Sequence, residues 1–390
     1  MGSKDDDYDP AGLIEASQLE DSGSIIFVSI NYRLGALGWS AGPLFESEGT
    51  TNLGLYDQRL AIEWVRDNIH LFGGDPEKVT IMGQAAGGTS VIYQITAYGG
   101  TTPIPFQQAI TQSAVTASYL NDTLRDQIYL EFLERLGVET LQEAKELSSE
   151  AVIEANKAHL NTIGPYDAIP YAPTVDGDIV PTLSETLLSE VTFNQSIKVM
   201  AGHNSNEAFL AADPRVTDDA SFAMFIQQGY PSLSRSDVDF LVEELYPAVY
   251  DGSQPYDNAF ERTVRAASEA EFECSSIYLA QAFPKRIYNY LFAVPPGFHA
   301  LDIAYTFFPT PTFDLLDNIF PPLNETVAKA LQQYITSFTQ DGQPRALAGP
   351  SWPLRGDIFT ELVLNNTDIY IATDSTSNLR CQFWQDAIAA

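Results

Sequence analysis

The segment Gly83-Gln-Ala-Ala-Gly-Gly88 has the spacing of a nucleophile elbow, but an alanine stands at its centre. In a Gly-x-Ser-x-Gly elbow, small flanking residues let a strained strand-to-helix turn close and expose a serine hydroxyl above the sheet. Here the central residue is Ala85, so the turn is preserved and the attacking oxygen is absent. The helix that follows would still direct its N-terminal amides at the site. The motif therefore predicts a hydrolase-like site without its nucleophile.

Two other interpretations of this segment stay open on the residues alone. Gly83 and Gly88, followed by Thr89 and Ser90, have P-loop spacing, but Thr89 replaces the lysine that would contact phosphate. Alternatively, the glycines serve only a tight turn. The 20 basic and 52 acidic residues give a formal net charge of −32, which repels phosphate groups and anionic membrane surfaces. The charge therefore argues against the P-loop and excludes nucleic-acid binding.

The segments around the turn predict alternating strands and helices. Residues 24–33 form a nearly continuous β-branched run, typical of a parallel strand covered on both faces. Apolar spacing predicts a helix over 58–72, ended by two glycines, then a strand over 78–82 and a helix over 89–98. Strand, helix, strand, helix predicts an α/β fold with a doubly wound parallel sheet.

The rest of the chain continues this organisation. Further strands are predicted over 198–202, 287–293 and 368–373, and the acidic segments 126–160 and 234–245 are typical of amphipathic surface helices. A hydrophobic content of 45% over 390 residues is enough for a large core, and no repeat or linker divides it. We therefore expect a single domain over residues 1–390. No run of 18 apolar residues occurs, so no membrane span is expected.

Longer stretches on both sides of the turn carry a resemblance to a known family. They are residues 52–65, 68–83, 109–113, 173–178, 202–209, 297–307 and 381–384. Together with the elbow they resemble the type-B carboxylesterases, which include the cholinesterases and fungal lipases, over essentially the whole chain. The resemblance implies the α/β-hydrolase fold, a doubly wound and mostly parallel sheet with helical insertions.

The resemblance also implies a Ser, Glu, His triad in that chain order. Carried onto this sequence, the nucleophile falls on Ala85, the acid on Glu207 and the base on His299. In an active relative the histidine would take the serine proton, the glutamate would orient the imidazole, and the backbone N–H of Ala86 would help to hold the oxyanion. A single histidine or glutamate is more often structural than catalytic. The motifs that flank Glu207 and His299 reverse this expectation, so we expect both residues at the catalytic positions.

No other residue is expected to replace the missing hydroxyl. Ser90 lies beyond one helical turn, and Ser113 follows a different strand. The remaining histidines match no catalytic position and are expected to be structural; they are His70, His159 and His203. No metal site and no cofactor are expected, because neither a His-Glu-x-x-His helix nor a ligand cluster is present.

The resemblance further implies that part of the sheet is missing. The family's second oxyanion element, a Gly-rich loop, follows a strand upstream of residues 24–33, and this chain starts beyond it. We therefore expect an N-terminally truncated sheet, with the lost strand between residues 24–33 and Val79. A chain without this strand should fold poorly, because backbone groups would stay unpaired. We also expect that the native product is longer and carries a leader. Ala85→Ser should restore 4-nitrophenyl ester hydrolysis in a complete parent but not in this chain.

Cysteines and sequons suggest an extracellular protein. Cys274 and Cys381 resemble the positions of a late cholinesterase disulfide, which would stabilise the fold by on the order of 4 kcal/mol. Two unpaired, buried thiols are the alternative. The even cysteine count and four sequons favour a secreted glycoprotein for the full-length parent. The sequon asparagines are Asn121, Asn194, Asn324 and Asn365.

Two functions follow from these residues. The first is a carboxylic-ester hydrolase scaffold that is inactive in this copy and would bind a small-molecule carboxylic ester or a lipid-like ligand if its pocket survives. The alternative is a non-catalytic, cholinesterase-like binding or adhesion protein. Retention of Glu207 and His299 favours the first; an acid–base role of this pair alone has no specific support.

Four aromatic residues either line a pocket or, more simply, pack in the core. They are Phe222, Phe225, Tyr305 and Phe308.

Overall fold

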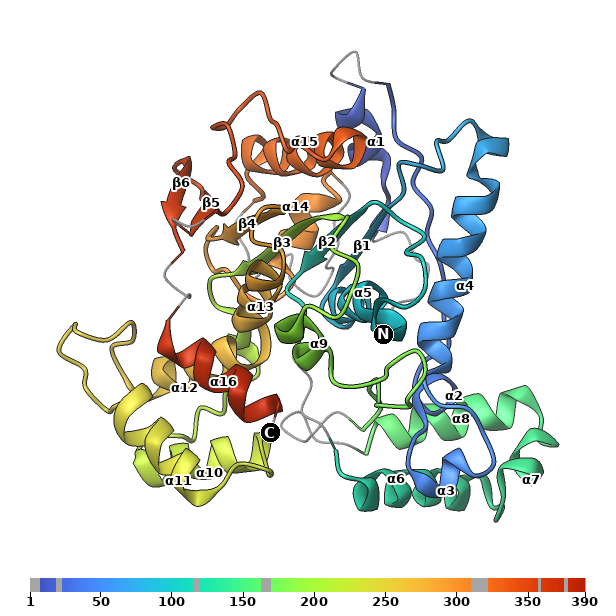
Figure 1. Cartoon of the computed structure of the whole chain (residues 1–390). Coiled ribbons are helices and arrows are strands. Elements are labelled where there is room, and N and C mark those ends of the chain that lie inside the picture. The colour runs from blue at the N-terminus through green and yellow to red at the C-terminus, as the bar shows by residue number, and fades with distance from the viewer. Residues whose placement is uncertain are drawn as a thin grey trace.

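The computed structural model describes residues 8–18, 23–115, 120–162, 170–309, 322–356, 359–374 and 378–389. Within these ranges the strands form one six-stranded sheet, and they lie side by side in the order in which they occur in the chain (Figure 1). The strands are β1 (Thr80–Gln84), β2 (Gln108–Gln112), β3 (Lys198–Asn204), β4 (Ile287–Phe292), β5 (Thr360–Leu364) and β6 (Ile369–Thr373). β1 to β5 are parallel, and β6 is antiparallel to β5.

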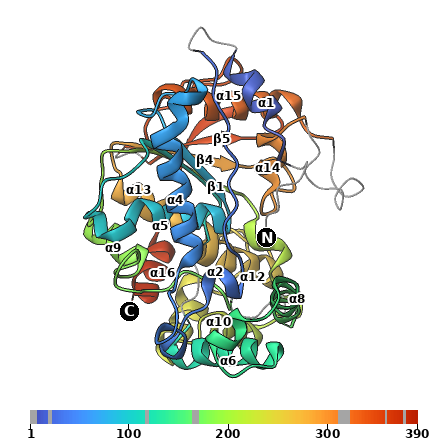
Figure 2. The same cartoon turned by 90° about the vertical axis from the view of Figure 1, so that its right-hand side faces the viewer.

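Helices cover both faces of this sheet (Figures 1 and 2). Successive strand residues point to opposite faces, and in β3 both sets are apolar. Val199 and Ala201 belong to the core cluster shared with one set of helices, whereas Met200 belongs to the cluster on the other face. The first set is α5 (Ala86–Thr96), α9 (Ser184–Glu190), α13 (Cys274–Ala282) and α16 (Leu379–Ala389); the second is α1 (Ala11–Ser17), α14 (Leu301–Thr306) and α15 (Glu325–Asp341). Such two-sided burial is typical of a doubly wound sheet.

The remaining helices lie outside these two layers or extend them. α4 packs on α5, and the acidic segments form short amphipathic helices away from the sheet (Figure 1). The α-helices are α2 (Ala36–Trp39), α3 (Pro43–Glu46), α4 (Leu53–Asn68), α6 (Asp122–Leu136), α7 (Leu141–Lys145), α8 (Ser149–Leu160), α10 (Asp219–Gly229), α11 (Arg235–Phe240) and α12 (Ala259–Ser268). The 3₁₀ and π turns are η2 (Ile69–Phe72), η3 (Ala97–Gly100), η4 (Glu207–Leu210), η5 (Leu241–Leu245) and η6 (Glu269–Glu273).

The predicted strand over residues 24–33 is wrong. This segment has no regular secondary structure, and Ile26, Val28 and Ile30 are 46%, 41% and 37% exposed. Ile25 and Phe27 pack against one core cluster and Tyr32 against another. A strand needs neighbours for its backbone N–H and C=O groups, and β1 ends the sheet in the described part of the chain. The strand expected between this segment and β1 stays a prediction.

The other predicted elements near the turn are confirmed with small shifts in their bounds. The strand over 78–82 is β1, the helix over 89–98 is α5, and the helix over 58–72 is α4 followed by η2. The later strands correspond to β3, β4 and β6. No strand range was predicted for β2 or β5, although Ser113 was expected to follow a strand. Among the described residues, no helix is both long enough and apolar enough to cross a bilayer.

Candidate functional site

The turn between β1 and α5 has the conformation of an elbow. Ala85 lies between the last residue of β1 and the first of α5, with φ 51° and ψ −120°, which a residue with a Cβ rarely adopts. Its N–H donates to the carbonyl of Gln112 at 2.9 Å. A Cβ at Gly83 would lie 2.2 Å from the carbonyl oxygen of Gly87, so only glycine fits there. The sequence thus keeps the residues that a strained turn requires.

The glutamate expected from the resemblance lies one loop away, beyond the end of β3. Glu207 begins η4 and is 1% exposed. Its Oε1 accepts hydrogen bonds from the Ser113 hydroxyl and from the backbone N–H of Asn204, both at 2.6 Å. Its Oε2 lies 2.5 Å from Nδ1 of His299. The carboxylate is therefore fully engaged, and one of its oxygens is committed to the imidazole.

His299 follows β4 in the loop before α14, and its loop is aligned with the Glu207 loop. An isolated parallel bridge joins Asn206 to Phe298, the residues just before the acid and the base, and Asn206 N–H donates to Gly297 at 2.8 Å. The other ring nitrogen of His299, Nε2, lies 3.1 Å from the side-chain amide nitrogen of Gln84. The structure thus brings His299 next to Glu207 and to the residue preceding Ala85.

Burial and pairing act in opposite directions on the two groups. Burial by itself raises the pKa of Glu207, but the hydrogen bond and the charge of His299 outweigh it and lower this pKa. Burial lowers the pKa of His299, and the hydrogen bond and charge of Glu207 outweigh it and raise that pKa. Both shifts favour the charged forms, so the two side chains act as one buried acid–base pair.

A helix with a π turn packs against both members of this pair. In η6, the ring of Phe272 lies 4.6 Å, centroid to centroid, from the imidazole of His299. Just before η6, the Ser268 hydroxyl accepts a hydrogen bond from the N–H of Ala208, at 3.0 Å. Burial raises the pKa of Glu271 in the same turn to about 7. π turns recur at functional sites, and this one supports the acid and the base at the same time.

A second buried carboxylate lies behind the pair and was not predicted. Asp302 accepts hydrogen bonds from the Tyr290 hydroxyl at 2.7 Å and from the side chains of Gln112 and Asn204, both at 3.1 Å. Asn204 also donates to the Ser113 hydroxyl at 3.2 Å, so Asp302 is connected to Glu207 through these groups. Burial raises the pKa of Asp302. Gln112, Asn204 and Asp302 lie in segments that carry the family resemblance, but the resemblance did not predict that their side chains meet.

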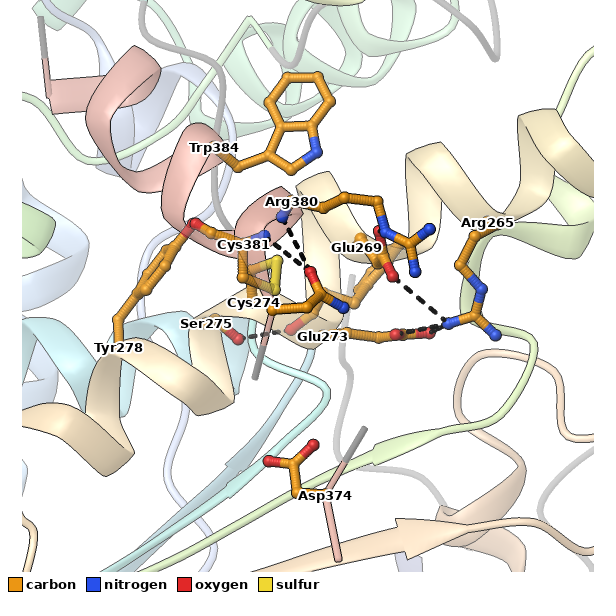
Figure 3. The surroundings of a disulfide bond; sticks show 12 residues. Arg265, Glu269, Glu273, Cys274, Ser275, Tyr278, Asp374, Arg380, Cys381 and Trp384 are labelled. Carbon is orange, nitrogen blue, oxygen red and sulfur yellow. Dashed lines mark hydrogen bonds and ion pairs between the residues drawn. A yellow bond between two sulfur atoms is a disulfide. The ribbon is translucent and has the colours of Figure 1, made fainter. Parts of the chain in front are cut away.

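The predicted disulfide is confirmed. Cys274, the first residue of α13, is bonded to Cys381 in α16, and both are buried (Figure 3). Ion pairs between two buried glutamates and two partly exposed arginines surround the bond. Nε of Arg380 lies 2.8 Å from Glu269, and Arg265 lies 2.8 Å from Glu273, so both ends of η6 are held in place. The disulfide and these charges tie the C-terminal helix to the turn that carries Phe272.

The remaining residues named from the sequence have different local environments. Ser90 donates to the Ala86 carbonyl within α5, and Ala86 itself begins the helix, where backbone N–H groups have no intrahelical acceptor. Of the other histidines, His159 and His203 are buried and His70 is exposed. The sequon asparagines are exposed or half-buried. Phe222 and Tyr305 are core residues, and Phe225 and Phe308 pack at the edges of core clusters. The described residues contain no metal-binding cluster.

Comparison with known proteins places this geometry in a family. The model of the carboxylesterase family matches residues 1–384. The chain belongs to the carboxylesterase family. The carboxylesterase patB of Aspergillus clavatus is 38% identical over 387 residues, which cover 99% of this chain and 68% of that protein. The crystal structure of Aspergillus niger EstA shares the fold, with a TM-score of 0.83 and 24% identity over 99% of this chain and 78% of that one.

More distant members of this carboxylesterase family differ in what their names say of activity and location. The inactive carboxylesterase-like protein VdtD of Byssochlamys spectabilis is 28% identical over 254 residues, 62% of this chain and 43% of that protein. Several relatives are named secreted lipases. The names of these relatives thus include both active and inactive proteins. Whether this chain is active must therefore be inferred from the residues of its site.

Proposed function

We propose that this chain is a carboxylesterase-family protein that binds a small-molecule carboxylic ester but forms no acyl-enzyme. The observation that carries the proposal is Ala85, whose methyl group stands at the centre of an intact elbow. Ester hydrolysis in this family's manner needs a nucleophile at that position, because a covalent intermediate splits one difficult step into two easier ones. A methyl group can neither attack the ester nor give up a proton to His299.

The remaining parts of the site support an ester as the ligand class. The Glu207–His299 pair has the hydrogen-bond geometry that orients an imidazole for proton transfer. The first N–H groups of α5, beginning at Ala86, are directed by the helix toward negative charge, as an oxyanion site requires. The name of the relative patB, a carboxylesterase, agrees with this ligand class.

A non-catalytic binding protein is the second candidate, and the name of one relative is compatible with it. A relative of this chain is named an inactive carboxylesterase-like protein. A scaffold that has lost its nucleophile can retain its pocket and its surface for another role. We further propose that the full-length protein is a secreted glycoprotein, supported by the disulfide, the sequons and the relatives named secreted lipases.

Hydrolysis of 4-nitrophenyl acetate and 4-nitrophenyl butyrate tests the proposed function. Triad enzymes that lose a member retain a rate enhancement of only about 10³ to 10⁴-fold over the reaction in water. We therefore expect at most this enhancement and no initial burst of 4-nitrophenol. His299→Ala is the matched control, and it should show no burst either and no higher rate. A burst of one nitrophenol per chain would overturn the proposal. A ligand that raises the unfolding temperature without being cleaved would support ester binding, whereas capture of a protein partner would support the second candidate.

A further inference from the structure

The side chain of Gln84 contacts the catalytic-type imidazole directly. Its Nε2 lies 3.1 Å from Nε2 of His299. The pattern Gly-x-Ser-x-Gly leaves the residue at its second position open, so the motif assigns no role to Gln84. The contact therefore needs an explanation of its own.

The direction of this hydrogen bond follows from the other side of the ring. Nδ1 of His299 faces the carboxylate of Glu207, which can only accept, so Nδ1 carries a proton. In the neutral imidazole, Nε2 then has a lone pair and no hydrogen. An amide NH₂ group only donates, so Gln84 donates to the lone pair of His299. This lone pair is the one that a general base would use.

The backbone holds Gln84 in place for this contact. It is the last residue of β1, opposite Gln112 in the parallel ladder, and the next residue donates its N–H to the Gln112 carbonyl. The strand and the elbow therefore fix where the Gln84 side chain begins. The Gln84 residue is half-buried, and its side chain reaches His299.

We propose that Gln84 is a lock on the base: its amide occupies the hydrogen-bonding position on Nε2 of His299 that a serine hydroxyl or a water would otherwise take. The lock rests on the proposed function, because an alanine at position 85 leaves that position to Gln84. Gln84 is thus a positioning residue. While the imidazole is neutral, Gln84 covers Nε2 of His299 and slows reactions at this nitrogen.

Three carboxyl groups near His299 also affect the pKa of its imidazole, and a variant of Gln84 would act in addition to them. Glu207 pairs with it through η4, Asp302 acts on it from α14, and Glu271 from η6. All three carboxyl groups raise the pKa of the imidazole. Gln84 is the uncharged member of this environment, on the side of β1. Replacing its amide with a carboxylate would add a fourth group of the same sign.

The four histidines of the chain allow a sharp test with diethyl pyrocarbonate, which acylates neutral, accessible imidazole nitrogens. His70 is exposed and serves as the internal reference, whereas His159 and His203 are buried and should stay protected. Peptide mass spectrometry would give the rate for each histidine separately. In the unaltered chain, His299 should react more slowly than His70, because both of its ring nitrogens are engaged.

Gln84→Met keeps the length of the side chain and removes the amide. It should speed the acylation of His299 about fivefold to tenfold, the net worth of one hydrogen bond, and leave His70 unchanged. Gln382→Met, at an exposed position of α16, is the matched control and should change none of the rates. An unchanged His299 rate in Gln84→Met would overturn the proposal.

Gln84→Glu keeps the test decisive if the methionine variant folds poorly. A carboxylate accepts from the protonated imidazole, so the midpoint of the pH profile of His299 acylation should rise by about one unit, and the rate at pH 7 should fall. A faster acylation of His299 in Gln84→Met together with a slower one in Gln84→Glu supports the lock. The same change of rate in both variants contradicts it. Neither the acylation rate nor its pH profile depends on ester hydrolysis. The lock can therefore be contradicted while the proposed function stands, and the proposed function can be contradicted while the lock stands.

Discussion

Replacing Glu207 with alanine is expected to lower the free energy of unfolding by about 3 to 5 kcal/mol, the loss typical of removing one partner of a buried ion pair. The carboxylate is 1% exposed, and the side chains of Ser113 and His299 and the N–H of Asn204 all depend on it. In the variant these donors would stay buried without their acceptor. Urea unfolding followed by circular dichroism at pH 6 would measure the loss.

The pH dependence of this loss follows from the two pKa shifts. Pairing lowers the pKa of Glu207 below its ordinary 4.5, so its contribution is present above about pH 4.5 and is lost as pH falls through the folded value. The pKa of His299 is raised above 6.5, so its contribution is complete below pH 6.5 and is lost as pH rises through the folded value. The difference between the two proteins should therefore be largest between about pH 4.5 and 6.5.

Two controls separate the charge from the shape of Glu207. Glu207→Gln keeps an acceptor for Ser113 and Asn204 but removes the negative charge, so it should cost less and lower the pKa of His299. Glu77→Ala, at an exposed position shortly before β1, should change the stability by no more than about 0.5 kcal/mol. A loss of less than about 1 kcal/mol in Glu207→Ala would contradict the described pair.

Removing the disulfide with Cys274→Ala and Cys381→Ala together is expected to lower the free energy of unfolding by about 4 kcal/mol. The bond closes a loop with a sequence separation of 107 residues, so it restricts the unfolded chain strongly. Both cysteines are buried, and alanine fills part of the space without adding a polar group. Urea unfolding of the double variant, beside the oxidised protein, would measure the effect.

The same double variant tests how the C-terminal helix is held. α16 is tied to η6 by the disulfide and by the ion pair of Arg380 with Glu269, so its amides should exchange faster with deuterium when the bond is absent. Arg235→Ala, which breaks an exposed ion pair with Asp239, is the matched control and should have almost no effect. Unchanged stability together with unchanged exchange in α16 would contradict this role of the bond.

The sequence predicted the parts of this fold that depend on local pattern. The elbow, β1 and α5 follow from small residues between two periodic segments, and they lie where the spacing placed them. Residues 24–33 show the limit of this approach. Their β-branched run predicts a strand, but pairing depends on a neighbour that a local pattern cannot supply.

The site shows the same division between local and long-range information. Ala85, Glu207 and His299 could be assigned from the resemblance, and the structure brings the acid and the base into contact. The contacts of Ser113 and Asp302 could not be predicted. Ser113 follows β2 and Asp302 lies in α14 after β4, and only the parallel sheet brings these two segments to one edge. Ser113 directly follows β2, and a polar residue at the end of a strand is the signal that could have indicated it, whereas Asp302 lies in α14 and has no such signal.

The central claim, that the intact elbow lacks a nucleophile, is tested most directly by intact mass after incubation with an excess of a fluorophosphonate. This reagent modifies an activated serine covalently and needs no turnover. We expect the chain to keep its mass of 42.9 kDa, because the hydroxyl that the Glu207–His299 pair would activate is absent at Ala85. One phosphonyl adduct per chain, mapped to a serine and abolished by His299→Ala, would contradict the account.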